Sequence, residues 1–552
     1  MSMSITVSSL AKELIGTDLI NMGFPQQGMY FKGYSYIGKK DKVTINVESE
    51  ISIEFLDALD QIALKHNEKG VVTQARQLKS LILDPDTVTV KTLKGFASGL
   101  ASYILRGIKN GWLYKLASND YYIAYMVDDI VFKRAVDRDD VSITTVSLMC
   151  HSAKDGSTKR TKLGFYTEDV RGKTIPQILK EKASLFKERD ELRAAYDESI
   201  LLYSDYQSRY GEQFRCIDDF EAQVEGNRFG SEKLSISKGG RLVNNEEGIG
   251  KQRHFGQTTI NRFWEKKGIE GDDVNEIPFH PYIFFFDLQE HENVWIYSKA
   301  IAPYKYDPTL KDKIVLPDDH RDLIDILVSD MDVIVEDFVE GKSGGSIILC
   351  MGPPGLGKTL TAEIYSEIVG KPLYRVHSGQ LGTNPETVEK RLAEILLRAE
   401  RWGALLLIDE ADIYIRERGD DMDHNAIVAS FLRRLEYFSG MLFMTTNRSN
   451  DVDDAIISRC AAVLKYDYPD AKQRDALWRS LSNQQGITLL ETVIADLVNE
   501  YVVICGRDIK SLLLLAAKYQ RVKERPLDLE TFRHCAIFRG VKHIQKSREK
   551  SH

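Results

Sequence analysis

The chain has 552 residues, of which 43% are hydrophobic and 28% charged, and its formal net charge is −8. This balance is typical of a globular protein long enough for three or four domains, and it excludes a disordered or collagen-like chain. Nucleic-acid binders usually carry a basic footprint, which a chain of net negative charge lacks as a whole, so nucleic acid is not favoured as a direct ligand.

The cysteines and the apolar runs bear on the compartment. Six cysteines are scattered without a CxxC pair or zinc spacing, which indicates small hydrophobes in a reducing environment. The N-terminus has no basic segment followed by an apolar run, so no secretory signal is expected. Apolar runs such as Leu512–Ala517 are far shorter than the ~20 residues of a membrane-spanning helix. We therefore expect a cytoplasmic protein with no membrane contact.

Residues 1–170 are expected to form an α+β domain. Phe96–Ile108 has a helical pattern, while Tyr121–Val136, Val141–Cys150 and Lys162–Phe165 are rich in β-branched and aromatic residues and are separated by turn signals. No catalytic constellation is found in this region.

A long helix is predicted to begin at Thr174. Thr174 and Gln177 form a capping box, and Pro176 lies in the first turn. Apolar residues then recur with a period near 3.5 as far as Tyr206, so the helix should run for about 30 residues. Pairing in a coiled coil is one interpretation, and packing on its own domain is the simpler one.

The rest of the region 171–300 mixes a loop with strands. Ser237–Gly256 is rich in Gly, Asn and charge and is expected to be a mobile loop. Strands are predicted at Tyr282–Leu288 and Val294–Tyr297, and an amphipathic helix begins at Asp319. We expect the region to take part in recognising a partner.

A glycine-rich loop within residues 301–469 is the clearest motif. The buried-strand pattern Ser346–Met351 leads into GPPGLGKT, and the helical run Leu360–Val369 follows. Glycines let backbone amides wrap closely around phosphates, and the helix N-terminus adds a positive dipole. Lys358 would reach the β- and γ-phosphates, and Thr359 would bind Mg²⁺. The expected nucleotide-binding residues are Gly352, Pro353, Pro354, Gly355, Leu356, Gly357, Lys358, Thr359 and Leu360.

Two further strands end in polar residues. The apolar run Ala404–Ile408 leads into Asp409 and Glu410, which suits a central parallel strand whose C-terminal end faces a ligand. Asp409 would hold Mg²⁺, and Glu410 would polarise the attacking water. The strand Met441–Met444 is followed by Asn447, whose amide is expected to hydrogen-bond the γ-phosphate or to orient the water.

Two arginines complete the expected catalytic set of Glu410, Asn447, Arg459 and Arg507. Arg459 lies 12 residues after Asn447, and arginine suits the neutralisation of charge in the transition state of phosphoryl transfer. Arg507 opens a helix in the C-terminal region and is placed to approach the phosphates. A structural role at the helix N-terminus is the simpler alternative for Arg507.

From about Asp318 to Gly540 these segments resemble the AAA family within the AAA+ superfamily. GPPGLGKT is similar to Walker A, LLLIDEAD to Walker B, TTNR to sensor 1, SRC to the arginine-finger segment and CGRD to sensor 2. The flanking sequence is similar to a sparsely characterised group of AAA proteins with long N-terminal regions.

The resemblance implies an α/β fold, a P-loop NTPase AAA+ module with helices on both faces of a parallel sheet. A small helical lid and a basic tail (Lys542–Lys550) would follow it at residues 470–552, and an α+β N-terminal region with a long helix would precede it. The resemblance also implies ATP and Mg²⁺ as cofactors and a homo-oligomeric ring, usually a hexamer, in which Arg459 acts on the neighbour's ATP. The lid helices are expected at Asp470–Gln485, Leu489–Val502, Arg507–Glu524 and Asp528–Lys546.

The sequence departs from the family at two places. Ser458-Arg459-Cys460 offers one arginine where the family commonly has two, which puts the finger geometry in doubt. Gln380-Leu381 stands where polypeptide-threading relatives have an aromatic and hydrophobic pair on a pore loop. Threading by aromatic pore loops is therefore not supported, although Leu381 could still line a pore.

The favoured function is an ATP-hydrolysing ring ATPase that remodels a protein partner recognised by the N-terminal region. The alternative is a nucleotide-dependent switch or loader on a nucleic-acid-associated complex, because net charge averages over faces and allows one basic face. A scaffold with a dead ATP site is disfavoured, since Lys358, Asp409, Glu410, Asn447 and Arg459 are all present.

Overall fold

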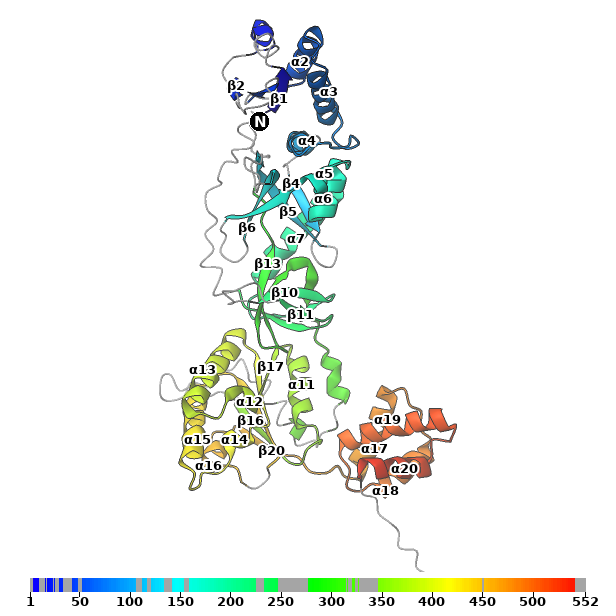
Figure 1. Ribbon diagram of the computed structural model, residues 1–552. Coiled ribbons are helices and arrows are strands. Elements are labelled where there is room, and N and C mark those ends of the chain that lie inside the picture. Colours follow the sequence, from blue (N-terminus) through cyan, green and yellow to red (C-terminus); the bar gives the residue numbers. More distant parts are fainter. Residues whose placement is uncertain are drawn as a thin grey trace, which may run out of the picture.

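In the computed structural model, the described residues form four β-sheets that follow one another along the chain. Figure 1 shows an elongated arrangement, with the N-terminal elements at one end and the C-terminal helices beside the last sheet. The structure describes residues 3–8, 15, 17–22, 24, 29–32, 42–47, 52–105, 112–116, 121–133, 141–152, 158–224, 233–246, 277–313, 315, 320–322, 326, 346–448 and 451–541.

The N-terminal layer pairs a small antiparallel sheet with two helices. The sheet has the order β1-β3-β2, and Phe55, Leu59, Ile62 and Val71 of the helices are buried together. The elements are β1 (Met3–Ser8), β2 (Met29–Lys32), β3 (Lys42–Val47), α2 (Ile53–Lys65) and α3 (Lys69–Leu83).

The second layer is a five-stranded antiparallel sheet of order β7-β6-β5-β4-β8. The helix predicted at Phe96–Ile108 and the three strands predicted after it are confirmed over the described residues, while residues 106–108 and 134–136 of these predictions lie outside them. The edge strand β8 lies beyond residue 170, where a domain boundary was expected, and pairs with β4. The elements are α4 (Leu93–Leu105), β4 (Trp112–Leu116), β5 (Tyr122–Lys133), β6 (Ile143–His151), β7 (Thr158–Phe165), α5 (Thr167–Val170), α6 (Ile175–Ala183) and β8 (Leu185–Lys187).

The prediction of one helix of about 30 residues from Thr174 is wrong in its extent. Thr174 does form the expected capping box, but α6 ends at Ala183, and its C-cap residue Ser184 adopts a left-handed conformation (φ 51°). The chain then supplies β8 to the edge of the sheet before α7 (Asp190–Gln207) begins. Pairing with an open sheet edge, a tertiary interaction, outweighs the helical periodicity at this point.

The third layer is a seven-stranded sheet of order β11-β10-β14-β13-β12-β9-β15. The strands predicted at Tyr282–Leu288 and Val294–Tyr297 are confirmed. The elements are β9 (Gln213–Cys216), β10 (Phe220–Val224), β11 (Lys233–Ile236), β12 (Arg241–Asn244), β13 (Tyr282–Asp287), β14 (Asn293–Tyr297), η3 (Ser298–Ala300), β15 (Ile301–Pro303) and η4 (Pro308–Lys313).

Part of the loop predicted at Ser237–Gly256 is wrong, because Arg241–Asn244 is strand β12 and pairs with β9 and β13. Residues 247–256 of that loop lie outside the described residues. So do most of the helix predicted from Asp319 and the basic tail after residue 541.

The fourth layer is a parallel sheet of order β17-β18-β19-β16-β20, covered on both faces. Alternate residues of its strands face α11 on one side and α13 with α15 on the other, which explains their continuous apolar runs. The strands are β16 (Ser346–Met351), β17 (Leu373–His377), β18 (Leu405–Asp409), β19 (Met441–Thr446) and β20 (Ala462–Lys465). The helices are α11 (Lys358–Val369), α12 (Ser378–Leu381), α13 (Pro385–Trp402), α14 (Asp412–Ile415), α15 (Met422–Leu435) and α16 (Asp454–Ile457).

Four helices form the C-terminal lid, as predicted. Trp478, Leu497, Leu512 and Phe532 are buried at its centre. The helices are α17 (Ala471–Gln484), α18 (Glu491–Glu500), α19 (Gly506–Lys523) and α20 (Leu529–Arg539). The predicted fold class is therefore confirmed. Across the part of the chain that the structure describes, no helix has the length and apolar character needed to cross a membrane.

Candidate functional site

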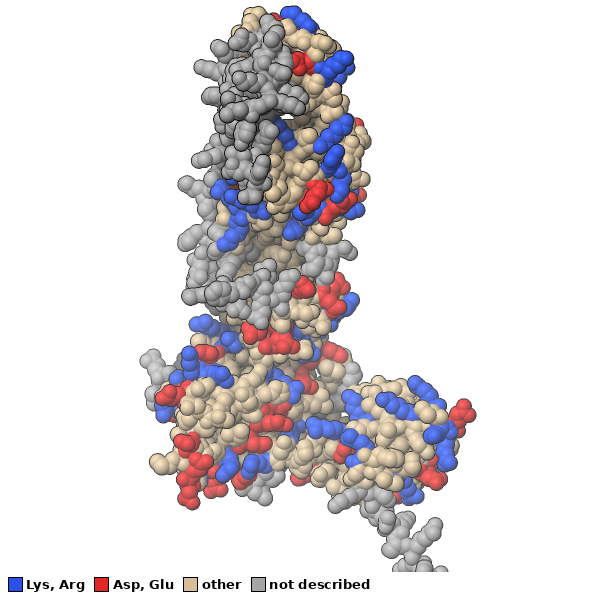
Figure 2. Space-filling view, in the orientation of Figure 1, with Lys and Arg blue, Asp and Glu red and all other residues tan. Residues whose placement is uncertain are grey.

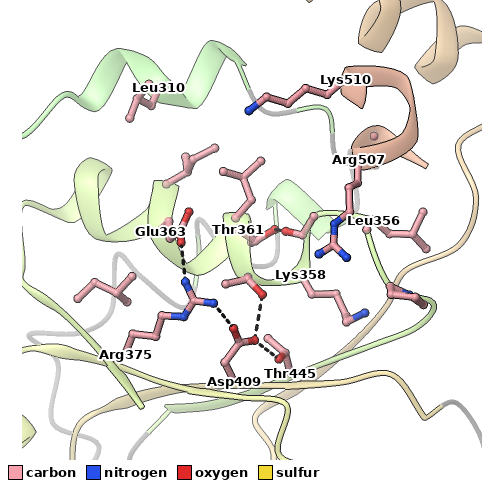
Figure 3. A pocket seen from close by; sticks show the side chains of 18 of the residues that line it. Leu310, Leu356, Lys358, Thr361, Glu363, Arg375, Asp409, Thr445, Arg507 and Lys510 are labelled. Carbon is pink, nitrogen blue, oxygen red and sulfur yellow. Dashed lines mark hydrogen bonds and ion pairs between the residues drawn. The ribbon is translucent and has the colours of Figure 1, made fainter. Parts of the chain in front are cut away.

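A cavity of about 1280 Å³ lies at the C-terminal edge of the parallel sheet. The loop after β16 and the first turns of α11 form its floor, and α17 and α19 of the lid form one wall. The turn between β11 and β12 also lines it, so the third layer contributes to the same cavity. Figure 3 shows lid and sheet side chains facing each other across α11.

The loop between β16 and α11 requires glycine for two reasons. Gly352, Gly355 and Gly357 have positive φ angles of 143°, 84° and 100°. A Cβ atom on Gly352 would lie 2.2 Å from the carbonyl oxygen of Tyr466, and one on Gly355 would lie 2.6 Å from Cys505 Sγ. The loop backbone therefore keeps its shape only without side chains at these positions.

Lys358 is held at the base of this loop. It is the first residue of α11, is 7% exposed, and its Nζ donates to the carbonyl oxygens of Gly352 at 2.6 Å and Pro353 at 2.8 Å. A third bond, to Asn447 Oδ1 at 3.0 Å, joins it to the end of β19. Burial lowers the pKa of Lys358 from its ordinary value. The two residues predicted to contact the γ-phosphate are thus in direct contact.

Asp409 is a buried carboxylate of the cavity that accepts three side-chain hydrogen bonds. Its Oδ1 accepts bonds from Thr359 Oγ1 at 2.9 Å and Thr445 Oγ1 at 2.6 Å, and its Oδ2 accepts one from Arg375 Nη2 at 2.5 Å. Burial alone would raise the pKa of Asp409, but these donors and the Arg375 charge outweigh it and lower the pKa. The carboxylate is therefore ionised at neutral pH.

The donor set at Thr359 and Asp409 fits Mg²⁺. A hydroxyl and a carboxylate are the hard oxygen ligands that Mg²⁺ prefers, and the ion usually takes one or two of them together with substrate phosphates and water. Among the residues that the structure describes, no group of three His, Cys, Asp or Glu could hold a metal by itself.

Glu410 has an unusual backbone conformation. It follows β18, is exposed, lines the cavity and has a φ of 56°. Its amide donates to Thr445 Oγ1 at 3.0 Å, which holds this conformation. A non-glycine residue with positive φ is strained, and such residues cluster at functional sites. The Glu410 carboxylate therefore lies at the cavity on a turn with a strained backbone, which the hydrogen bond to Thr445 stabilises.

Of the remaining predicted residues, the structure brings Arg507 to the cavity but not Arg459. Arg507, at the start of α19, extends toward Lys358 (Figure 3). Arg459 follows α16 and donates to the carbonyl oxygen of Ala455 at 3.0 Å, with Glu436 3.9 Å away. It does not line the cavity of its own chain.

The structure does not support a pore-lining role for Leu381, which the sequence had left open. Leu381 is fully buried in the core beside α13. The segment forms the short helix α12, and the hydroxyl of Tyr414 donates to the carbonyl oxygens of Ser378 and Gly382, both at 2.7 Å. These bonds fold the segment inward.

Arg375 and Thr445 were not predicted from the sequence as residues of the site. Both bond Asp409 from neighbouring strands. The available signal for Arg375 was an arginine inside the otherwise apolar strand segment Leu373–Val376. Thr445 gave none, because a threonine at the end of a strand is common.

Comparisons with known proteins match part of the chain to a described family. Residues 348–468 match the family described as ATPase family associated with various cellular activities (AAA). The uncharacterized AAA family ATPase y4kL of Sinorhizobium fredii is 35% identical over 136 residues, which are 23% of this chain and 40% of that protein. The outer mitochondrial transmembrane helix translocase of Danio rerio is 26% identical over 184 residues, 31% of this chain and 48% of that protein.

Among solved structures, the FIGL-1 AAA domain in complex with ADP is similar at a TM-score of 0.35 and 18% identity. That likeness covers 43% of this chain and 86% of the FIGL-1 chain. The chain spans about half the length, or less, of the curated relatives given above.

Proposed function

Because residues 348–468 form an ATPase domain of the AAA family, we propose that this chain hydrolyses ATP and uses the cycle to remodel a protein partner. The observation that carries the proposal is the convergence of Lys358, Asp409 and Asn447. Lys358 donates to Asn447, and Asp409 accepts a bond from Thr359, the residue after Lys358. All of them lie beside a glycine loop whose backbone excludes side chains. A phosphate cradle, a carboxylate for a metal ion and an amide at a third strand end are the parts that phosphoryl transfer requires.

Each side chain has a proposed task. Lys358 and the loop amides bind the β- and γ-phosphates, while Thr359 and Asp409 hold Mg²⁺. The ion, when bound, neutralises charge on the phosphate oxygens. Glu410 polarises the attacking water, and Asn447 orients it or the γ-phosphate. Arg507 contributes positive charge to the cavity from the lid helix α19.

Arg459 supports an oligomeric form of the proposal. Its guanidinium lies outside the cavity of its own chain, yet arginine is the residue that phosphoryl transfer uses to neutralise transition-state charge. We infer that it serves the nucleotide of a neighbouring copy, in a homo-oligomeric ring that is a hexamer. A site completed across an interface makes turnover depend on assembly.

The N-terminal layers are the proposed site of partner recognition. The divisions expected at residues 170, 300 and 469 and the cytoplasmic location stay predictions.

Figure 2 shows acidic and basic side chains interspersed over the face of the nucleotide module in view, without a uniformly basic field there. A protein partner is therefore preferred to nucleic acid.

Glu410→Gln tests the proposal. The amide cannot polarise water, whereas the phosphate cradle is untouched, so turnover should fall at least about 100-fold with ATP binding retained. ATP hydrolysis and nucleotide binding are measured on the full chain. Glu417→Gln, the same change at an exposed glutamate seven residues on, should hydrolyse ATP as the wild type does. Undiminished turnover in the Glu410 variant would overturn the assignment.

A further inference from the structure

Arg375 stands in a position that the proposed mechanism does not use. β17 pairs in parallel with β18, so that Arg375 lies opposite Leu407 and His377 lies opposite Asp409. Because side chains alternate along a strand, Arg375 and Asp409 extend from the same face of the sheet. Figure 3 shows the Arg375 guanidinium between Asp409 and Glu363, beneath α11.

The guanidinium bridges two carboxylates. Its Nη2 lies 2.5 Å from Asp409 Oδ2, and its Nη1 lies 3.5 Å from Glu363 Oε1. Asp409 is 5% exposed, and a buried carboxylate is costly unless a counter-charge or donors compensate it. Among the ion pairs of the described residues, Arg375 is the cation paired with Asp409.

The two oxygens of Asp409 are divided between different partners. The hydroxyls of Thr359 and Thr445 occupy Oδ1, and Arg375 occupies Oδ2. The same carboxylate is the proposed metal ligand. An arginine on one of its oxygens leaves fewer lone pairs for a divalent cation and adds a like charge beside it.

We propose that Arg375 is the counter-ion of Asp409 in the metal-free site and competes with the divalent cation for that carboxylate. The inference rests on the proposed nucleotide site. With no metal bound, Arg375 reduces the repulsion between Asp409 and the nucleotide phosphates. When Asp409 holds a cation, Arg375 releases or shares Oδ2 of Asp409. The Glu363 carboxylate is already in place as the other acceptor for the guanidinium.

Two substitutions should shift metal dependence in opposite directions. In Arg375→Gln the competitor is gone, so the Mg²⁺ concentration that half-saturates tight ADP binding should fall about tenfold, the order expected for a charge-assisted hydrogen bond. Binding of ADP in EDTA should weaken in the same variant. In Glu363→Gln the Arg375 guanidinium loses its alternative carboxylate. The Mg²⁺ concentration at half-saturation should therefore rise at least about twofold.

The experiment titrates Mg²⁺ into the full chain with a fluorescent ADP analogue, and it needs no turnover. Arg391→Gln is the matched control: Arg391 is exposed and donates to the carbonyl oxygen of Gln380 at 2.8 Å, so the same change there should leave the titration unchanged. Thermal melting of each variant establishes that it is folded.

The outcomes separate this inference from the nucleotide site on which it rests. A wild type that binds ADP, with variants at Arg375 and Glu363 that titrate as it does, overturns the role of Arg375 alone. A wild type that binds no ADP in either EDTA or Mg²⁺ overturns the nucleotide site as well. If Arg375→Gln does not fold, the Mg²⁺ titration of Glu363→Gln still tests the proposal. A half-saturating Mg²⁺ concentration that does not rise in that variant would contradict the competition.

Discussion

At residue scale, Gly352 is the position where the loop has least freedom. With φ at 143° and the Tyr466 carbonyl oxygen 2.2 Å from an added Cβ, Gly352→Ala forces a backbone shift. Strain of this kind costs about 1–3 kcal/mol, so the melting temperature should fall by several degrees and ATP binding should weaken. Calorimetry and nucleotide titration measure the two effects. Gly419→Ala, where nothing lies within 4 Å of the added atom, should melt as the wild type does.

Lys358 gives a second test at this scale. Lys358→Ala removes the cation that joins the loop to Asn447, and the loss of charge-assisted bonds to phosphate should weaken ATP binding about 10- to 100-fold. Isothermal titration measures this affinity. Lys390→Ala, at an exposed position of α13, serves as the control. Equal affinity in the Lys358 variant and the wild type would contradict the phosphate-binding role.

Local motifs account for most of the candidate site that the sequence predicted. Lys358, Thr359, Asp409 and Asn447 each follow a recognisable strand, and their spacing fixes which strand end they reach. Arg375 could not be predicted in the same way, because its role depends on which strand lies beside β18 in the sheet. That neighbour follows from the order of the folded sheet and not from spacing along the chain.

At the scale of elements, Glu367 links the nucleotide module to the third layer. This α11 residue is 5% exposed and accepts bonds from Tyr304 Oη at 2.7 Å, the Asp307 amide at 3.0 Å and Arg241 Nη2 at 3.4 Å. Since α11 begins at Lys358, the helix that carries the phosphate-binding lysine is bonded to the seven-stranded sheet. A second contact joins Phe286 of β13 to Tyr374 and Trp402.

Glu367→Gln should destabilise the chain through this link. An amide of the same shape offers one acceptor oxygen where the carboxylate offers two, so buried donors lose a partner at a cost of about 1–3 kcal/mol. Chemical denaturation of the full chain measures the change. Glu394→Gln, on the exposed face of α13, should stay within about 0.5 kcal/mol of the wild type. An equally small effect at Glu367 would show that the link carries no net stability.

The elements themselves were predictable where patterning was local. The apolar strands of the parallel sheet and the first three lid helices appear close to where their periodicity and length placed them. The fourth lid helix, predicted to run to Lys546, ends at Arg539, because Gly540 adopts a left-handed conformation and caps it. The helix from Thr174 did not run as predicted, because Ser184 turns the chain so that Leu185–Lys187 can pair with β4, a contact about 70 residues away in sequence. The burial of Leu381 could not be predicted for a similar reason, since the Tyr414 bonds that fold α12 inward come from a distant segment.

At the scale of the whole molecule, the prediction concerns the proposed action of Arg459 on the nucleotide of a neighbouring copy. If it acts on the neighbouring copy, Arg459→Ala should bind ATP without hydrolysing it, and so should Glu410→Gln. Mixing the two variants should restore part of the turnover, because some interfaces then combine an intact arginine with an intact glutamate. The rate of each variant alone at the same total concentration is the control. An Arg459→Ala protein that hydrolyses ATP at the wild-type rate would refute the assignment.

The most direct test of the whole account is native mass spectrometry of Glu410→Gln with ATP and Mg²⁺, which reads nucleotide occupancy and assembly together. We expect a closed assembly of six chains with one ATP retained in each subunit, because the variant binds the nucleotide and cannot turn it over. Chains that carry no nucleotide would contradict the proposed site. A monomer that carries ATP would uphold the site and contradict the proposal that Arg459 of a neighbouring copy completes it.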